Sequence, residues 1–254
     1  MTDEQSAAEV NRAHYGELSA GRDDYWRKMA APRFRVATIL SLLAEEPFDS
    51  VVDLGCGNGC LLAEIAGRWP SVRLAGIDLS GPQIEENHRS APNILWHVAN
   101  LDEPAVFSRH LPGHFDAVVA SEVIEHVDQP EVFLENALAL AAPPRGRLLL
   151  STQSGPIGGT ERRVGHRRHF GAEEMRFRLI KAGWQPVRIW NSGFPFHDLS
   201  KWYANLAPDS TMKSFGEGAY GPFENAVCCL LRGAFHLNSL TRGAQLFAVA
   251  RRLI

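Results

Sequence analysis

The chain of 254 residues is long enough for one α/β domain with an elaboration, or for a domain with a small helical cap. Its hydrophobic content of 45%, charged content of 22% and net charge of −3 are ordinary for a globular protein and exclude a general attraction to nucleic acid or anionic lipid. The polar N-terminus is not typical of a signal peptide, and no apolar run approaches a membrane span. The four cysteines show neither metal nor disulfide spacing, so we expect a cytoplasmic protein without a membrane partner; the oligomeric state stays open.

The predicted elements alternate between helices and strands. Near the N-terminus the spacing predicts helices over 7–18 and 22–43, the second with a break at Ala31-Pro32. Further helices follow the first, second, fourth and fifth strands, over 61–66, 83–88 (with Ser80 as N-cap), 130–140 and 172–181. Strands are predicted over 50–54, 72–78, 94–98, 115–120, 147–152, 185–190 and 244–251. This order predicts an α/β fold with a seven-stranded, doubly wound, mostly parallel sheet, N-terminal helices and a helical insertion before the last strand.

The stretch from Val51 to Gly59 is the most informative in the chain. A hydrophobic strand ending in Asp53-Leu54 is followed by glycines at every second position, and glycine lets a ligand approach the main chain. Asp78 ends the next strand, where nucleotide-binding βαβ units bind a ribose diol. The pattern therefore predicts a nucleoside site. Because Asp53 would repel a pyrophosphate but suits an ammonium or sulfonium group, the pattern favours S-adenosylmethionine over NAD.

With these motifs the chain resembles the class I, Rossmann-like S-adenosylmethionine-dependent methyltransferases over residues 30–192 and 244–251. The resemblance implies that Asp53 binds the amino-acid end of the cofactor, that Asp78 binds its ribose, and that a helical cap over 1–46 precedes a Rossmann-like domain over 47–254. Asn100 stands where this family usually has an aspartate for the adenine amine. The remaining expected cofactor contacts are Gly55, Cys56 and Gly57 through the main chain, Leu79 and Leu101, Ser121 near the sulfonium, and Arg35 at the carboxylate, with Arg33 as its rival.

A second cluster, Glu122, Glu125 and His126, directly follows the fourth strand. On a helical turn these three side chains would share one face, and two carboxylates beside an imidazole repel one another unless they share a cation or a proton. The E-x-x-E-H-V stretch and the later Gly-His resemble the ubiquinone-biosynthesis O-methyltransferases and the small-RNA 3′-end methyltransferases. That resemblance implies a site for Mg²⁺, Mn²⁺, Fe²⁺ or Zn²⁺ made of Glu122, Glu125, His126 and His166. His169 is a second candidate from the same loop.

Three interpretations of this cluster stay open. A divalent ion would bind an acceptor hydroxyl and lower its pKa. Without a metal, His126 would be the general base and Glu122 and Glu125 would orient it. In the third interpretation the glutamates cap the following helix and His126 only packs.

The sequence therefore predicts methyl transfer from S-adenosylmethionine to a small-molecule acceptor, at oxygen. The aromatic residues within 193–242 either pack an extra helical pair over the sheet edge or close over the acceptor. The first rival is an RNA 3′-end 2′-O-methyltransferase; the net charge of −3 argues against nucleic acid, in spite of Arg162-Arg163 and Arg167-Arg168. The second rival is a non-catalytic, S-adenosylmethionine-binding regulatory protein, and the occupied Glu122, Glu125 and His126 positions argue against it.

Overall fold

The computed structural model describes residues 23–104, 111, 113–216 and 219–253; the helix predicted over 7–18 lies outside them. Seven strands form one sheet in the order β3-β2-β1-β4-β5-β7-β6, in which β7 is antiparallel to β5 and β6 and the other pairs are parallel. The strands are β1 (Ser50–Leu54), β2 (Arg73–Asp78), β3 (Leu95–Val98), β4 (Ala117–Ser121), β5 (Arg147–Gln153), β6 (Trp184–Ser192) and β7 (Gln245–Arg252). The predicted fold class is confirmed.

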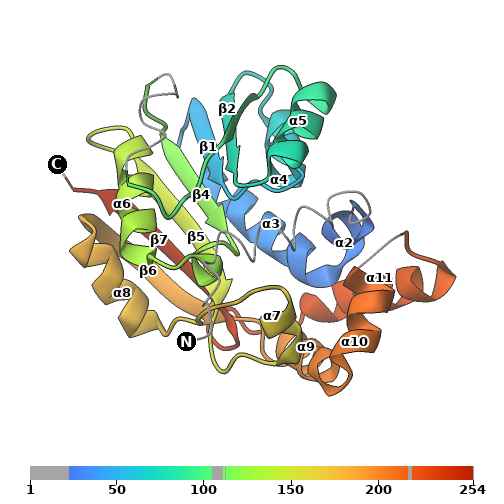
Figure 1. Cartoon of the computed structure of the whole chain (residues 1–254). Helices are drawn as coiled ribbons and strands as arrows, with labels where there is room; N and C mark the ends of the chain where they lie inside the picture. The colour runs from blue at the N-terminus through green and yellow to red at the C-terminus, as the bar shows by residue number, and fades with distance from the viewer. Residues whose placement is uncertain (1–22, 105–110, 112, 217–218, 254) are drawn as a thin grey trace, which may run out of the picture.

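Helices cover both faces of the sheet (Figure 1). On one face α3 (Ala30–Ala44), α4 (Cys60–Arg68) and α5 (Gly81–Ser90) form a core with the strand residues that point toward them, such as Val51 and Val119. On the other, α6 (Pro130–Leu140) and α8 (Ala172–Lys181) pack on Val52, Val118 and Leu150. β1 and β5 are buried along their whole length, as expected for strands of a sheet covered on both faces, and each has an apolar centre, Val51-Val52 and Leu148-Leu149-Leu150.

The N-terminal helices differ from the prediction in one respect. The break lies at Met29, between α2 (Asp23–Lys28) and α3, and not at Ala31-Pro32. Pro32 is tolerated in the first turn of α3, where its missing N–H would have had no intrahelical partner. α3 contributes Ile39, Leu40 and Leu43 to the core that it shares with α4, α5 and the sheet. The domain boundary expected at residue 46 stays a prediction.

The insertion leaves the sheet at the carboxyl end of β6, which runs in the same direction as β5. It contains α9 (Phe196–Leu206), α10 (Pro208–Thr211), a π-helical turn over Met212–Gly216, and α11 (Pro222–Phe235). Together with α7 (Gly159–Arg163), these helices gather beyond one end of the sheet, beside α2 and α3 (Figure 1). Among the described residues, no helix has the length and apolar character needed to cross a bilayer.

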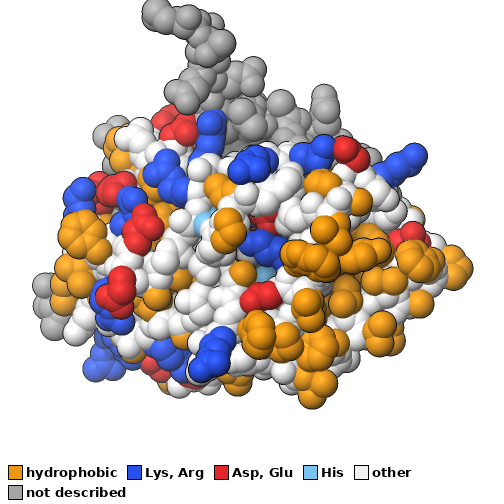
Figure 2. All heavy atoms as spheres, turned by 90° about the horizontal axis from the view of Figure 1, so that it is seen from below, with side chains coloured by type: hydrophobic (Ala, Val, Ile, Leu, Met, Phe, Trp, Pro, Cys, Tyr) orange, Lys and Arg blue, Asp and Glu red, His pale blue; other side chains and the backbone are white. Residues whose placement is uncertain are grey.

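The aromatic residues of the insertion divide between inside and outside. Tyr220 and Phe235 are buried, whereas Trp202 and Tyr203 are 61% and 72% exposed. Figure 2 shows apolar side chains gathered on one side of the face that is seen from below. The other exposed large apolar residues of the insertion are Phe194, Leu199, Leu206, Phe223, Leu230, Leu237 and Leu240.

Candidate functional site

A cavity of about 200 Å³ opens at the carboxyl ends of β1, β2 and β4. Its walls include every residue that the sequence assigned to the cofactor, namely Arg35, Asp53, Gly55, Cys56, Gly57, Asp78, Leu79, Asn100, Leu101 and Ser121. Trp26, Val36, Gln83 and Val123 also line it, and no sequence pattern singled them out. We call this space the cofactor cavity.

In the glycine turn between β1 and α4, both main-chain polar groups of Gly57 form hydrogen bonds to side chains. Its N–H donates to Oδ2 of Asp78 at 2.8 Å, and its carbonyl accepts from Nδ2 of Asn87 at 2.7 Å. Gly57 has φ of +49°, and a Cβ built there would meet nothing within 4 Å. The missing side chain therefore leaves open space on the cavity side, which is what a ligand touching the main chain requires.

Two carboxylates lie close together in this cavity. Burial raises the pKa of Asp53 to about 8, and the charge of Asp78 adds to the effect. Burial also raises the pKa of Asp78, although hydrogen bonds from the N–H groups of Ser80 and Gly57 oppose the shift. A ligand cation beside Asp53 would lower the cost of its charge, in agreement with the ammonium site expected there.

Of the two arginines that were candidates for the cofactor carboxylate, only Arg35 lines the cofactor cavity. Arg35 is 5% exposed, lines the cofactor cavity and lies 3.9 Å from Glu122. Arg33 instead forms an ion pair with Glu64 of α4 at 2.6 Å. Arg35 is therefore the arginine placed to meet a cofactor carboxylate.

Asn100 and Ser121 lie at the expected strand ends, and the side chain of each already has a hydrogen-bond partner within the protein. Oδ1 of Asn100 accepts a hydrogen bond from the N–H of Asp102 at 3.1 Å. The hydroxyls of Ser121 and Ser151 are 2.9 Å apart. An amide oxygen has two lone pairs, so Asn100 retains acceptor capacity for an amine.

A second cavity, of about 420 Å³, adjoins the first and shares Trp26, Arg35, Glu122 and His126 with it. We call it the acceptor cavity. Much of its wall is apolar and comes from α2, α3 and the insertion, including Tyr25, Met29, Tyr203, Met212, Phe215, Val227, Leu231 and Phe235. Its polar side chains are Arg35, Glu122, His126, Gln153, Thr160, Glu161, His166, His197, Ser200, Lys201 and Thr211.

The prediction of a helical turn directly after β4 is wrong at Glu122. This residue has φ of +58°, and only Ile124–His126 form a short 3₁₀ turn. The Glu122 carboxylate accepts hydrogen bonds from Nε2 of Gln153 and of Gln245, both at 2.8 Å. Burial alone would raise the pKa of Glu122, but the charge of Arg35 and these amide donors outweigh it and lower the pKa. Glu122 is thus an ionised side chain that connects the ends of β4, β5 and β7.

Three of the four expected metal ligands come together. One ligand atom from each of Glu125, His126 and His166 lies within 4.8 Å of the others, and Glu122 is outside this group. Oε2 of Glu125 accepts from the Thr152 hydroxyl at 2.8 Å, whereas its buried Oε1 has no hydrogen-bond partner among the described residues. Burial, reinforced by the charge of Glu122, raises the pKa of Glu125 well above its usual range.

A chain of hydrogen bonds sets the tautomer of His166. The carbonyl of Gly155 can only accept, so Nδ1 of His169, 3.0 Å away, donates to it. In the neutral ring Nε2 of His169 then accepts from Nδ1 of His166 at 2.9 Å. Burial is the main cause that lowers the pKa of His166 to about 2, so its imidazole is neutral and the lone pair lies on Nε2. His169 thus orients His166, and is not part of the ligand group itself.

Comparison with known proteins agrees with this geometry. A family model described as a methyltransferase domain matches residues 25–205. The chain belongs to this methyltransferase family. Its fold and its glycine turn are those of the class I, Rossmann-like, S-adenosylmethionine-dependent type, and the predicted resemblance is confirmed.

Curated relatives match over less than half of the chain. The mitochondrial ubiquinone biosynthesis O-methyltransferase of Schizosaccharomyces pombe is 34% identical over 104 residues, which are 41% of this chain and 38% of the relative. The trans-aconitate 2-methyltransferase of Azoarcus sp. is 38% identical over 82 residues, 31% of this chain and 32% of the relative. The matches therefore span only about a third of the length of these relatives.

Solved structures match over nearly the whole chain at low identity, and so show the fold alone. The N-methyltransferase NodS from Bradyrhizobium japonicum, in complex with S-adenosyl-L-homocysteine, has a TM-score of 0.60 and 18% identity, with 96% of this chain and 98% of that chain covered. The plantazolicin methyltransferase BamL, in complex with a triazolic desmethyl analogue and S-adenosylhomocysteine, has a TM-score of 0.63 and 13% identity, with 97% and 96% covered.

Proposed function

We propose that this protein transfers the methyl group of S-adenosylmethionine to a hydroxyl oxygen of a largely apolar small molecule. The observation that carries the proposal is the junction of the two cavities at Arg35, Glu122 and His126. A methyl donor in one cavity and an acceptor in the other would meet there, as an in-line displacement requires.

The cofactor cavity supports an adenosyl sulfonium ligand. Asp53 suits the ammonium group of its amino-acid end, and Arg35 suits the carboxylate. Asp78 has lone pairs left for the ribose hydroxyls after accepting from Gly57 and Ser80. The sheet edge places all of these groups within one cavity, where doubly wound folds bind nucleosides.

The acceptor cavity supports an apolar molecule with a polar head. The charges in it are balanced, since Arg35 lies 3.9 Å from Glu122 and Nζ of Lys201 lies 3.2 Å from Oε1 of Glu161. Because each cation has its own carboxylate, the cavity has no strong preference for an acidic acceptor. The curated O-methyltransferase relative agrees with oxygen as the atom methylated.

We further propose that Glu125, His126 and His166 hold a divalent cation. The buried Oε1 of Glu125 without a partner among the described residues and the lone pair of His166 Nε2 fit such an ion, because a ligating histidine normally donates its other N–H to a neighbour. When bound, the ion would lower the pKa of an acceptor hydroxyl. In this assignment Glu122 positions Arg35 and the strand ends, and His126 is a ligand and not the general base.

A methyl-transfer assay with labelled S-adenosylmethionine tests the proposal, with 4-hexylcatechol as the acceptor probe. We expect labelled methyl ether that disappears on chelation and returns when Mg²⁺, Mn²⁺, Fe²⁺ or Zn²⁺ is added back. Indifference to chelator would leave His126 as the base. Label found in a short RNA, with binding that weakens steeply as salt is raised, would favour the RNA-end activity instead.

A further inference from the structure

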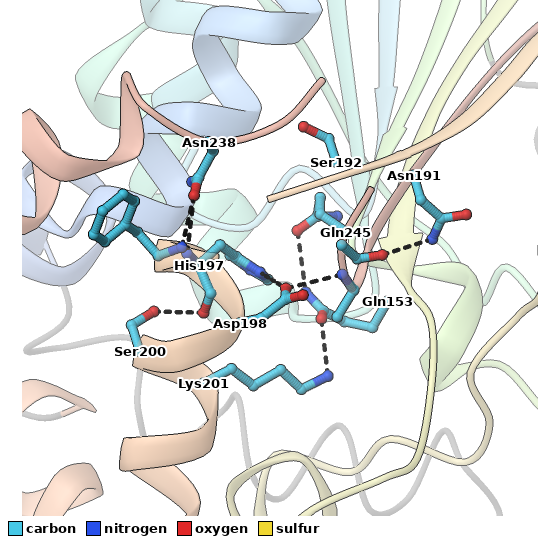
Figure 3. A network of polar contacts seen from close by, with 12 residues as sticks. Gln153, Asn191, Ser192, His197, Asp198, Ser200, Lys201, Asn238 and Gln245 are labelled. Atoms are coloured by element: carbon cyan, nitrogen blue, oxygen red, sulfur yellow. Dashed lines mark hydrogen bonds and ion pairs between the residues drawn. The ribbon is translucent and has the colours of Figure 1, made fainter. Parts of the chain in front are cut away.

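The acceptor cavity contains a histidine that belongs neither to the cofactor contacts nor to the Glu125, His126 and His166 group. His197, in the first turn of α9, is 4% exposed and lines this cavity. Its Nδ1 lies 3.2 Å from Oδ1 of Asp198, and Figure 3 shows the two side chains facing each other. A carboxylate only accepts hydrogen bonds, so Nδ1 carries the proton and the lone pair of the neutral ring is on Nε2.

The structure holds this ring closely. Oδ1 of Asn238 accepts hydrogen bonds from the N–H groups of Phe196 and His197, at 2.8 and 3.4 Å, and so fixes the start of α9. Figure 3 shows Asn238 beside His197. A Cβ at Gly193 would lie 2.9 Å from Cβ and 3.0 Å from Nδ1 of His197, so only glycine permits this approach. The ring of Phe235 packs edge-on at 5.8 Å between centroids. Gly193 and Asp198 thus approach His197 at its Cβ and Nδ1, and the residue lines the acceptor cavity.

Asp198 is suited to stabilise a positive charge on this ring. Burial alone would raise the pKa of Asp198, but hydrogen bonds from His197 and from the N–H of Ala244 at 2.9 Å outweigh it, and the pKa is lowered. Asp198 is therefore an ionised carboxylate. A carboxylate that orients an imidazole and stabilises its protonated form is the arrangement found beside the base of hydrolytic triads.

The other charged groups near this pair are already matched. Lys201, one turn along α9, has its Nζ 3.1 Å from Oε1 of Gln153 (Figure 3). The same Nζ lies 3.2 Å from Oε1 of Glu161. On the sheet side of the cavity, Arg35 faces Glu122. Both cations thus have another carboxylate, and Asp198 remains the acid in contact with His197.

We propose that His197, oriented by Asp198, is the base that removes the proton of the acceptor hydroxyl. The inference rests on the proposed function, in which the other two histidines of this cavity, His126 and His166, use their lone pairs as metal ligands. The acceptor O–H bond breaks and its proton moves to Nε2 of His197. The oxygen forms a bond to the methyl carbon while the carbon–sulfur bond breaks, with its electron pair staying on sulfur as a neutral thioether. The imidazolium proton then leaves to water.

Two acceptor probes of different acidity test this assignment. In His197→Asn the amide N–H₂ replaces Nδ1–H toward Asp198, but no basic nitrogen remains. With 4-hexylcatechol we expect kcat to fall about 100-fold or more, while the Kd of S-adenosylhomocysteine stays within about twofold. With 4-nitrocatechol, whose hydroxyl ionises without help, we expect a loss of less than about tenfold. His236→Asn, at the exposed end of α11, is the matched control and should leave both rates unchanged.

Asp198→Asn provides a second variant, because its amide oxygen still accepts from Nδ1–H while the negative charge is lost. We expect a smaller kcat loss, again concentrated on 4-hexylcatechol. Equal losses on both probes, or no loss in His197→Asn, would overturn the role of His197 while leaving methyl transfer intact. A wild-type protein that methylates neither catechol would instead overturn the proposed acceptor class, and the role of His197 with it.

Discussion

Oδ2 of Asp78, at the end of β2, accepts a hydrogen bond of 2.8 Å from the main-chain N–H of Gly57, in the turn after β1. One carboxylate therefore both supports the glycine turn and faces the cofactor cavity. The expected ribose contact and the shape of the turn depend on the same side chain.

Asp78→Ala removes both contributions at once. Because hydrogen bonds to charged groups contribute about 1.5–3 kcal/mol each, we expect the Kd of S-adenosylhomocysteine to rise at least about 100-fold. Isothermal titration calorimetry measures it directly. Glu86→Ala, a change of an exposed carboxylate on α5, is the control and should bind like the wild type. Unchanged affinity in Asp78→Ala would remove the ribose assignment.

Gly55 and Gly57 should respond differently to alanine. A Cβ at Gly57 meets nothing within 4 Å, so Gly57→Ala should lose only about 1–2 kcal/mol of folding free energy, for its positive φ, while the methyl group obstructs the cofactor. A Cβ at Gly55 would lie 2.4 Å from Cγ2 of Val123, so Gly55→Ala should be the less stable variant. Denaturant unfolding and calorimetry separate the two effects. Normal cofactor affinity in Gly57→Ala would contradict main-chain contact at this position.

Asp53 should release a proton when the cofactor binds. With a pKa of about 8 in the free protein, roughly 0.9 of this carboxyl group is protonated at pH 7, and a ligand ammonium beside it favours the ionised form. Binding enthalpies measured at pH 7 in buffers of different ionisation enthalpy should therefore give close to one proton released. The release should decline as pH rises through 8, and Asp53→Asn should abolish it. Enthalpies independent of the buffer would place the ammonium elsewhere.

The metal assignment predicts one divalent ion per chain in protein purified without chelator. Elemental mass spectrometry should show that Glu125→Ala and His166→Ala lose it. Glu161→Gln is a matched control, because Glu161 is also a buried acid of the acceptor cavity but pairs with Lys201. Loss of the ion in this control as well as in Glu125→Ala would point to general disruption, and full retention in all three variants would exclude the proposed ligands.

The sheet and the cofactor cavity were accessible to sequence reasoning because their signals are local. Buried strands such as β1 and β5 contain short apolar runs that a sequence shows directly. The glycines come directly after β1, and Asp78 is the last residue of β2. The conformation of Glu122 was not accessible, because Gln153 and Gln245, which come from β5 and β7, hold it from far along the chain. His197 gave no signal either, since a single histidine in an aromatic segment shows nothing of the cavity that it lines.

Which side chains of the insertion line the acceptor cavity was equally inaccessible from the sequence. The aromatic residues of the insertion were candidates for closing over the acceptor, but Trp202 is 61% exposed and does not line the acceptor cavity. Leu231 of α11 does line it. A larger side chain at 231 should take up part of the roughly 420 Å³ available to an apolar acceptor. We therefore expect Leu231→Trp to raise the KM for 4-hexylcatechol about tenfold or more while the Kd of S-adenosylhomocysteine stays the same. Trp202→Ala should alter neither constant, and an effect of Trp202→Ala that exceeds that of Leu231→Trp would move the acceptor from the cavity to the exposed face of α9.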